Sequence, residues 1–596
     1  MAIETNNETT IVETGASYLT TPVTEERFLT PEQLTDEQRY MRESAATFFQ
    51  REIVPADEQI EHQEPGVLAG LVKKAGEQGL LMIDIPEAYG GAELGLIVSS
   101  LVGGELRQAS FSVAWGAHTS IGSLPIVFYG NDEQKRKYLP RLATGEIIGA
   151  YALTEPGVGS DAMAIKTRAQ LSEDGAHYIL NGAKQWISNA GFADLMVVFA
   201  KIDDTKHTAF IVESAWPGVS TGAEERKMGI KGSSTRTVYF DNVKVPVENV
   251  LGEIGKGYKI AFNILNIGRV KLGMGAAGGA KSALTLAAQY AGERKAFGHP
   301  LHDFGMIKKK LAYMAADAYA AESIGYRVVG DVEAAREAAG DDQQAQLAAI
   351  EEYAIECSIA KVYGSEALGR CVDEGVQVFG GYGFMEEYPI TRAYRDARIN
   401  RIFEGTNEVN RLVAAGTLFR RTVKGGLGLM AAFPQVEAEV ASGAAPDFAT
   451  DATPAALRES VNLVERLKRA ALYSVMKGAT KFMATMEEEQ EFLEYAANQL
   501  INVYAMDSAV ARALMAVKQG GVDARTHELL AQVAVLRLLP ETKTALENTI
   551  TRAFEGEERR AELAKVRAYV GDAETDIVPA QRELAGIVSE RAAYPL

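Results

Sequence analysis

The stretch from 401 to 408 reads Arg-Ile-Phe-Glu-Gly-Thr-Asn-Glu and places one carboxylate, Glu404, between an apolar pair and a glycine. Apolar neighbours desolvate a carboxylate and raise its pKa toward neutrality, which suits a base that removes a weakly acidic C–H proton. Gly405 leaves room for a ligand to approach the backbone, and Thr406 can supply a hydroxyl. Taken alone, the octapeptide is equally consistent with a surface glutamate in a loop that enters a helix.

A second informative segment lies far upstream and reads Tyr-Ala-Leu-Thr-Glu-Pro-Gly-Val-Gly-Ser-Asp at 151–161. Its glycines and proline predict a turn in which Thr154, Ser160 and their amides can bind a polar ligand. Asn-Gly at 181–182, between apolar runs, predicts a β-hairpin turn. Trp-Ile-Ser at 186–188 offers a flat ring and a hydroxyl, which suit an aromatic cofactor. Each segment alone could equally be an ordinary turn or an ordinary core tryptophan.

In this order and spacing, the segments resemble those of the acyl-CoA dehydrogenase family. The resemblance also takes in Arg-Lys-Ala-Phe-Gly at 294–298 and Gln-Val-Phe-Gly-Gly-Tyr-Gly-Phe at 377–384, and it covers residues 35–420. Five motifs in the same order make a chance match very unlikely. Chain length and the Trp-Ile-Ser form at 186–188 resemble most the very-long-chain branch, which carries an extra C-terminal helical domain.

The resemblance implies a mainly α-helical fold with an inserted antiparallel β-domain: a helical domain, the β-domain and a four-helix bundle, plus the extra C-terminal helical domain. The pattern of the chain agrees, because helical spacings stand on both sides of a region of short β-rich runs. The expected segments are a flexible N-terminal extension at 1–34, an N-terminal helical domain at 35–147, a middle β-domain at 148–253, a helical bundle domain with the catalytic base at 254–425, an Ala/Pro/Gly-rich linker at 433–454 and a C-terminal helical domain at 455–596.

Composition narrows the class of protein. At 596 residues the chain is too long for a single core, and 47% hydrophobic with 24% charged residues is typical of a soluble globular protein. A net charge of −19 argues against nucleic acid as a partner. The two cysteines, Cys357 and Cys371, make no disulfide framework or thiolate cluster. His299 and His302 lack a third ligand nearby in sequence, so no metal site is expected.

The sequence predicts a cytoplasmic protein without stable membrane insertion. No apolar run reaches the roughly 18 residues that span a bilayer, and residues 1–30 resemble neither a secretory signal nor a transit peptide. Peripheral membrane contact stays open, because one C-terminal helix is basic and amphipathic. Its cations are Lys468, Arg469, Lys477 and Lys481, and its apolar stripe is Leu457, Val461, Val464 and Leu467. A stripe of this width more often packs into a protein core, and we favour that interpretation.

The resemblance implies that Glu404 is the base in α,β-dehydrogenation of an acyl-CoA thioester, taking the α-proton while the β-hydrogen leaves as hydride to FAD. Some relatives carry the base where Gly268 stands here, and a glycine cannot do that work. Substrate contacts are implied for Asn266 and Arg269, although Arg269 could instead be a buried structural arginine. The implied substrate-binding set is Ser160, Asn266, Arg269, Gly405, Val113 and Ala117.

Val113 and Ala117 match the pocket floor, where medium-chain relatives carry a glutamine and a glutamate. Small apolar residues there deepen the pocket and favour a long acyl chain, whereas an inward Trp115 would close the same space.

The resemblance also assigns FAD contacts. The implied cofactor-binding residues are Tyr151, Leu153, Thr154, Gly159, Ser160, Trp186, Ile187, Ser188, Arg294, Phe297, Gln377, Gly380, Gly381, Thr406 and Glu408. Most relatives carry threonine at the position of Ser188, and serine retains the hydroxyl of that threonine. Medium-chain relatives carry glutamine at the position of Glu408. In the family, the Arg294 and Gln377 groups come from the neighbouring subunit, so a homodimer or a dimer of dimers is expected.

Three functions follow as hypotheses. The favoured one is an FAD-dependent dehydrogenase that converts long-chain acyl-CoA to trans-2-enoyl-CoA, the first step of fatty acid β-oxidation, and passes electrons to electron transfer flavoprotein. A catalytically idle relative that serves as an assembly scaffold is an alternative from another class, and the intact Glu404 argues against it. An acyl-CoA oxidase, with similar chemistry and length, is the third.

Overall fold

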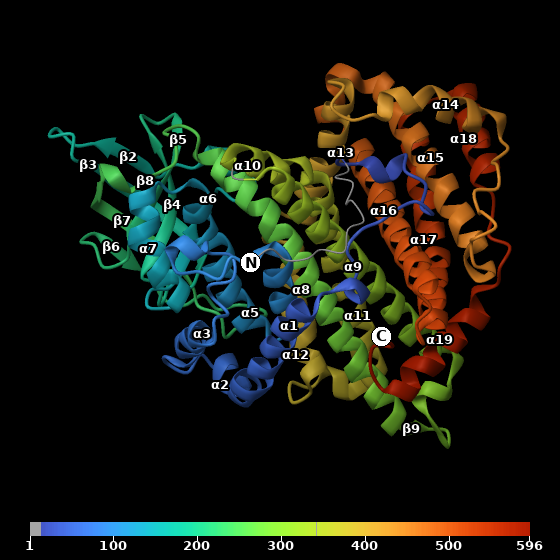
Figure 1. Ribbon diagram of the computed structural model, residues 1–596, viewed down its shortest axis with the longest axis horizontal. Coiled ribbons are helices and arrows are strands. Elements are labelled where there is room, and N and C mark those ends of the chain that lie inside the picture. Colours follow the sequence, from blue (N-terminus) through green and yellow to red (C-terminus); the bar gives the residue numbers. More distant parts are fainter. Residues whose placement is uncertain (1–13, 341) are drawn as a thin grey trace.

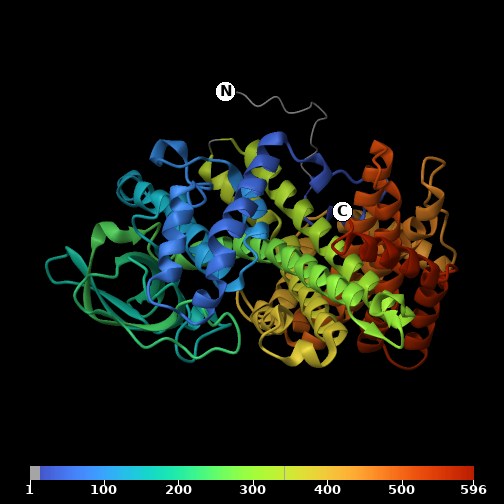
Figure 2. The ribbon, with the colours of Figure 1, turned by 90° about the horizontal axis from the view of Figure 1, so that it is seen from below.

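The computed structural model describes residues 14–340 and 342–596 (Figure 1). A β-domain lies at one end, long helices fill the middle, and a second helical lobe lies at the other end, an arrangement also visible from below in Figure 2. The mainly α-helical fold with an inserted β-domain and an extra C-terminal helical domain is therefore confirmed.

Seven short helices form the first part of the chain. Thr35 caps the first of them, because its side chain accepts a hydrogen bond from the Gln38 backbone amide at 3.2 Å while the Thr35 amide donates to Oε1 of Gln38 at 3.0 Å. Their apolar faces bury residues such as Leu71 and Val72. The helices are α1 (Asp36–Phe48), α2 (Asp57–Glu61), α3 (Val67–Glu77), α4 (Gly95–Glu105), α5 (Ala109–Gly116), α6 (Leu124–Tyr129) and α7 (Asp132–Thr144).

The β-domain is one eight-stranded sheet in the order β6-β7-β3-β2-β4-β5-β8, with β1 beside β4. Most neighbours are antiparallel as expected, but β1 and β2 both pair with β4 in parallel. The strands are β1 (Gly149–Ala152), β2 (Arg168–Leu171), β3 (His177–Ser188), β4 (Leu195–Ile202), β5 (Lys206–Glu213), β6 (Val219–Thr221), β7 (Thr235–Pro246) and β8 (Val250–Leu251).

The predicted hairpin turn at 181–182 is wrong, because β3 continues through both residues. The pairing of β3 with β7 shifts register between Leu180 and Gly182. Gly182 has φ 150°, and a Cβ there would lie 2.7 Å from the Thr167 hydroxyl. The glycine thus serves a bulge and a close approach of two strands rather than a reversal of the chain.

Long helices make up the bundle domain in the middle of the molecule. α11 packs against α8, α9 and α13, and their facing sides are rich in alanine, so the helices approach closely. A small two-stranded hairpin, β9 (Lys295–Ala296) with β10 (His299–Pro300), follows α8. The helices are α8 (Gly257–Glu293), α9 (Gly305–Ala338), α10 (Gln343–Glu352), α11 (Ala354–Phe379), α12 (Pro389–Ala397) and α13 (Asn407–Val423).

The C-terminal lobe packs directly on this bundle. α16, α17 and α19 all contact α9, so the lobe extends the bundle rather than hanging from it. By length and composition α16 could span a bilayer, but 83% of its apolar window is buried inside the fold, as in a core helix. The helices are α14 (Leu429–Ser442), α15 (Arg458–Phe482), α16 (Gln490–Gln519), α17 (Ala524–Ala553), α18 (Gly556–Val570) and α19 (Ile577–Arg591).

The stretch expected as a linker at 433–454 is partly helical, which corrects the prediction. α14 runs from Leu429 to Ser442 and buries Val436 and Val440 against the lobe. The helix ends at Gly443, whose φ of 67° stops it, and only the part after it is extended. Alanine content signalled a loop here, although alanine is also the strongest helix former.

The amphipathic helix predicted between residues 457 and 481 is α15, and its apolar stripe is buried in the protein core as favoured. Its cations face acids of this chain: Arg469 meets Glu439 and Glu465, Lys477 meets Glu437, and Lys481 meets Glu558. The basic side of the helix is therefore neutralised from within the fold.

The prediction of a flexible N-terminal extension is wrong for residues 14–34, whereas residues 1–13 lie outside the described part of the chain. This segment, here called the strap, runs across the bundle to the C-terminal lobe, where it is the dark blue chain beside α13 and α15 in Figure 1. Its apolar side chains provide the reason, because they bury almost completely. They are Tyr18, Leu19, Val23, Phe28 and Leu34.

Buried charges fasten the strap to both neighbours. Arg327 of α9 meets Glu26 of the strap and Asp507 of α16, each at 2.6 Å. Asp507 also meets Lys468 of α15 at 2.7 Å, and Lys468 donates to the Thr21 carbonyl at 2.6 Å. We call Glu26, Arg327, Lys468 and Asp507 the strap network. This network connects the strap, the bundle and the C-terminal lobe, which are far apart in sequence, within the core.

Candidate active site

A cavity of about 880 Å³ lies between the N-terminal helices, the bundle and the end of β3, which carries Ser188. Glu404, Val113, Ala117 and Ser188 all line it, so the fold brings the predicted base, the pocket floor and one cofactor residue to one space. Glu404 follows the 3-10 turn after α12, and the two floor residues come from α5 and the turn after it.

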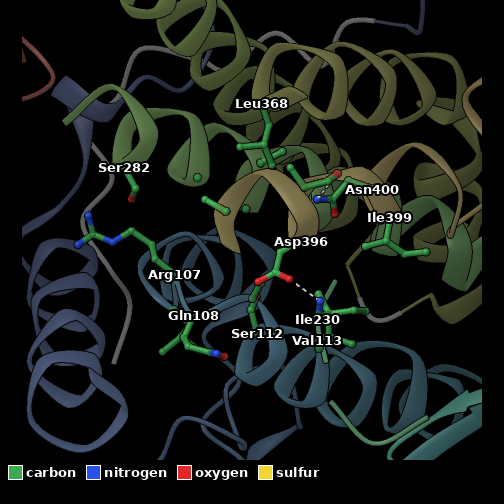
Figure 3. Close-up of a pocket in the computed structure, with 18 of the residues that line it drawn as sticks. Arg107, Gln108, Ser112, Val113, Ile230, Ser282, Leu368, Asp396, Ile399 and Asn400 are labelled. Carbon is green, nitrogen blue, oxygen red and sulfur yellow. Dashed lines mark hydrogen bonds between the residues drawn. The ribbon is translucent and has the colours of Figure 1, made fainter. Parts of the chain in front are cut away.

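Figure 3 shows part of this cavity, where Ser112 and Val113 lie opposite Asp396 and Asn400. The Ile230 amide donates to Asp396, which joins a loop of the β-domain to α12 at the cavity wall. Burial raises the pKa of the Asp396 carboxyl to about 6. The sequence analysis missed Asp396, because its only local signal is one acid inside a strongly amphipathic helix.

Glu404 itself sits in a left-handed turn. Its φ is 58° and that of Gly405 is 81°, so the backbone reverses here and presents the carboxylate to the cavity. Among the described residues, the Oε2 atom of Glu404 is buried and has no hydrogen-bond partner. This desolvation raises the pKa of Glu404 to about 7, although the charges of Arg269 and Lys361 oppose the shift. The environment is that of a base held near neutrality.

Gly268 of α8 lies directly against the base. A Cβ at Gly268 would be 2.9 Å from Oε2 of Glu404, closer than a carbon and an oxygen can pack. Some relatives carry the base at the position of Gly268. That position therefore lies in contact with the Glu404 carboxylate. The glycine leaves the room that Glu404 occupies.

The two polar residues expected at the substrate, Asn266 and Arg269, lie beside the turn and do not line the cavity. Arg269 is 6% exposed, and it donates to Asn266 Oδ1 at 2.9 Å and to the Glu404 carbonyl at 3.3 Å. These contacts hold the backbone at Glu404, as expected if Arg269 is a buried structural arginine.

The glycine-rich segment at 151–161 forms an exposed turn after β1, with Thr154 half-buried and Gly159 and Ser160 exposed. A buried ion pair that the sequence analysis missed holds this turn, because Lys184 meets Glu155 at 2.6 Å and the Leu153 carbonyl at 3.0 Å. Glu155 also accepts from the Thr167 amide and hydroxyl. The pair fixes the turn relative to β3.

Next to that turn, the Trp186 side chain is 59% exposed, an unusual state for so large an apolar ring. Its φ is 58°, and Ser188, two residues on, is half-buried at the cavity wall. By contrast Tyr151, Leu153 and Ile187 are buried among core residues. The side chains of these three buried residues support the predicted cofactor-binding surface from beneath. That surface is formed by Trp186, Ser188 and the turn.

Thr406 and Glu408 lie at the start of α13. The Thr406 hydroxyl accepts from the Val409 amide at 3.2 Å and caps the helix. The pKa of the Glu408 carboxyl is lowered by a hydrogen bond from its own backbone amide and by a second one from the Thr406 side chain. Glu408 is exposed.

The remaining predicted cofactor residues lie on another surface. Arg294, at the end of α8, stacks over the Tyr382 ring at 5.8 Å, which brings it beside Gly380 and Gly381. Phe297 is 94% exposed, and Gln377 is exposed on α11. These residues form one patch, and they do not line the cavity with Glu404. Within one subunit, the predicted cofactor residues therefore fall into two separate groups.

The cavity walls are formed by small residues that the sequence analysis did not single out. Added Cβ atoms at Gly104, Gly116 and Gly275 would meet nothing within 4 Å, so these glycines border open space. Trp115 lies at the cavity wall, where its indole donates to the Leu80 carbonyl at 2.9 Å and its side chain is 3% exposed. Helical glycines are an indistinct signal in sequence, since they also serve close helix packing.

Comparisons with known proteins agree with this geometry. Models of the N-terminal, middle and C-terminal domains of acyl-CoA dehydrogenase match residues 35–146, 150–243 and 255–419, and a further acyl-CoA dehydrogenase C-terminal model matches 466–568. A probable acyl-CoA dehydrogenase of Bacillus subtilis is 45% identical over 98% of both chains. The very long-chain specific enzyme of rat mitochondria is 38% identical over 81% of this chain and 75% of its own.

A solved structure is similar over the same length. The acyl-CoA dehydrogenase of Bacillus anthracis, complexed with FAD, superposes with a TM-score of 0.94 at 44% identity, over 98% of this chain and all of that one. A mainly α-helical fold with an inserted β-domain and a glutamate at one large cavity defines the class. This chain belongs to the acyl-CoA dehydrogenase family.

Proposed function

We propose that this protein is an FAD-dependent acyl-CoA dehydrogenase that oxidises long-chain acyl-CoA to trans-2-enoyl-CoA with Glu404 as the base. The observation that carries the proposal is the unpartnered, desolvated Glu404 carboxylate beside a large cavity, with its pKa raised to about 7. A base in that state takes an α-proton at neutral pH better than a solvated glutamate does.

The residues around the cavity fit FAD. An exposed indole, the Ser188 and Thr154 hydroxyls and an open glycine-rich turn offer an aromatic face with polar groups at its edge. When bound, the flavin accepts the β-hydrogen of the substrate as hydride. The chain supplies the rest: Glu404 takes the α-proton, and the C–H electron pair at the α-carbon becomes the second bond of the alkene as the hydride leaves.

We also propose that the acyl chain is long. Val113 and Ala117 supply an apolar floor, and glycines of α4, α5 and α8 border the open space. The similarity to the rat very long-chain enzyme supports the same conclusion. Electron transfer flavoprotein is the proposed electron acceptor, and the first step of β-oxidation the proposed place of the reaction.

A graded series of saturated acyl-CoAs, from four to twenty carbons, tests the proposal under anaerobic conditions. We expect bleaching of the flavin absorbance, with the highest kcat/KM beyond about twelve carbons. Lack of bleaching by every thioester would favour the scaffold alternative. Rapid hydrogen peroxide formation in air, without any need for electron transfer flavoprotein, would favour the oxidase.

The pH dependence follows from the raised pKa of Glu404. The carboxylate is the reactive form, so kcat/KM for flavin reduction should rise as the pH increases toward 7 and level off above it. The direction is fixed because protonation below that pH removes the base. A profile already flat at pH 5.5 would mean that Glu404 is an ordinary solvated acid.

The exposed patch around Arg294 gives a prediction about the cofactor. Because its guanidinium suits the FAD pyrophosphate and lies apart from the Glu404 cavity, we propose that this patch completes the cofactor site of a neighbouring subunit. Arg294→Ala should then lose flavin during extensive dialysis and shift toward monomer in sedimentation. Arg560→Ala, which removes an exposed arginine of the C-terminal lobe, is the control and should keep its flavin.

A further inference from the structure

A buried lysine lies directly beneath the turn that carries the base. Lys361 of α11 has no exposed surface, and its ammonium donates to the Gly405 carbonyl and to Asn407 Oδ1, both at 2.7 Å. Gly405 follows Glu404 in the chain, so the lysine holds the peptide unit next to the base. The family resemblance gave no role to this residue.

The stability of the fold does not explain why the buried residue at position 361 is a charged lysine. Both acceptors are neutral, and in residues 14–340 and 342–596 the lysine forms no ion pair. Burying an ammonium without a carboxylate partner is costly, and an apolar side chain of similar size would serve the core better. Burial lowers the pKa of Lys361 to about 7, and the charge of Glu404 is the largest influence against that shift. The two groups therefore interact through the interior.

The turn around Glu404 needs support, because a non-glycine residue at φ 58° is strained unless its surroundings fix it. Asn410 donates to the carbonyls of Gly405 and Thr406 at 2.8 and 3.0 Å, and Arg269 donates to that of Glu404 at 3.3 Å. Lys361 adds a second donor to the Gly405 carbonyl. Lys361 thus shares the support of this turn with Asn410 and Arg269.

We propose that Lys361 is a positioning residue for the base: its ammonium holds the Gly405 carbonyl so that the Glu404 carboxylate points into the cavity, and its positive charge favours the carboxylate of Glu404 over the acid. The inference rests on the proposed role of Glu404. It adds a reason why the pKa of Glu404, whose Oε2 is desolvated, stays at about 7, since the charges of Arg269 and Lys361 both offset the desolvation.

Stopped-flow flavin reduction by a long-chain acyl-CoA, measured from pH 5.5 to 9, tests the proposal on the intact flavoprotein. Lys361→Met keeps the length of the side chain and removes its charge and its donors. We expect reduction slower by roughly 100-fold, because the base is misplaced, and a midpoint of the pH profile above that of the wild type. Binding of the enoyl-CoA product should change only a few-fold. Lys361→Arg keeps the charge and should keep the midpoint.

The control is Lys310→Met, which removes another lysine that pairs with α11 through Glu374 but lies outside the cavity lining. It should leave rate and midpoint unchanged. A flavin-loaded Lys361→Met protein with the wild-type midpoint would overturn the proposal, even if it were less stable. If the methionine variant does not retain flavin, Lys361→Gln decides, since an unchanged midpoint without the charge would equally overturn it. The wild-type profile by itself tests Glu404, so the two failures are distinguishable.

Discussion

Glu404→Gln is expected to bind flavin and acyl-CoA normally and to reduce the flavin more slowly by roughly 10²- to 10⁴-fold, the usual contribution of a general base. The amide has nearly the same shape as the carboxylate and fits the same space beside Gly268. It cannot accept the α-proton, however. Because Oε2 has no hydrogen-bond partner among the described residues, replacing it by an amide breaks no bond that holds the fold.

Single-turnover reduction under anaerobic conditions measures this effect without interference from the electron acceptor. Glu437→Gln, in the C-terminal lobe, removes one carboxylate far from the cavity and should leave the rate as it is. Reduction by Glu404→Gln at a rate close to that of the wild type would show that another group takes the proton, and the base assignment would be abandoned.

Asp507→Ala is expected to destabilise the junction between the bundle and the C-terminal lobe by about 3–5 kcal/mol, the usual cost of removing one partner from a buried ion pair. Asp507 has no exposed surface and contacts both Arg327 and Lys468 of the strap network. Its removal leaves Lys468 with Glu465 and Arg327 with Glu26, two cations served by fewer carboxylates. The strap, fastened by the same groups, should loosen as well.

Urea unfolding followed by circular dichroism, together with limited proteolysis of residues 14–34, measures both effects. Asp572→Ala removes an exposed aspartate that pairs with Lys543 and should change neither. An Asp507→Ala midpoint equal to that of the wild type would show that the strap network contributes no net stability. Resistance of the strap to proteolysis in that variant would show that apolar contacts of Tyr18 and Phe28 suffice to hold it.

The motifs of the sequence, through their resemblance to a known family, were enough to predict the fold class and to single out Glu404 as the proposed base. The turn at Glu404 was recognisable from Gly405, because glycine adopts a positive φ readily, whereas the desolvation of Oε2 comes from the surrounding fold, since the adjacent Ile402 is itself 49% exposed. The alternation of helical and β-rich regions likewise follows from periodicities in neighbouring residues. The apolar stripe of α15 was recognisable for the same reason.

Features that depend on partners far away in the chain were decided only by the tertiary structure. Asn-Gly at 181–182 is a turn signal in isolation, yet the approach of Thr167 makes it a bulge within β3. The polar strap has no helical or strand pattern of its own. The strap is ordered because Glu26 pairs with Arg327 and because the apolar side chains of the strap are buried against helices more than 300 residues later in the chain.

Lys361 belongs to the same group. A lysine inside an alanine-rich helix carries no sign in the sequence of what its ammonium contacts, and the contact is with a turn 44 residues later. The sequence pointed to Glu404 as the proposed base and to the mainly α-helical fold with its inserted β-domain. Only the packing of α8, α11 and α13 decided which charges surround that base, because the electrostatic energy of a buried group depends on distances that the chain order does not contain.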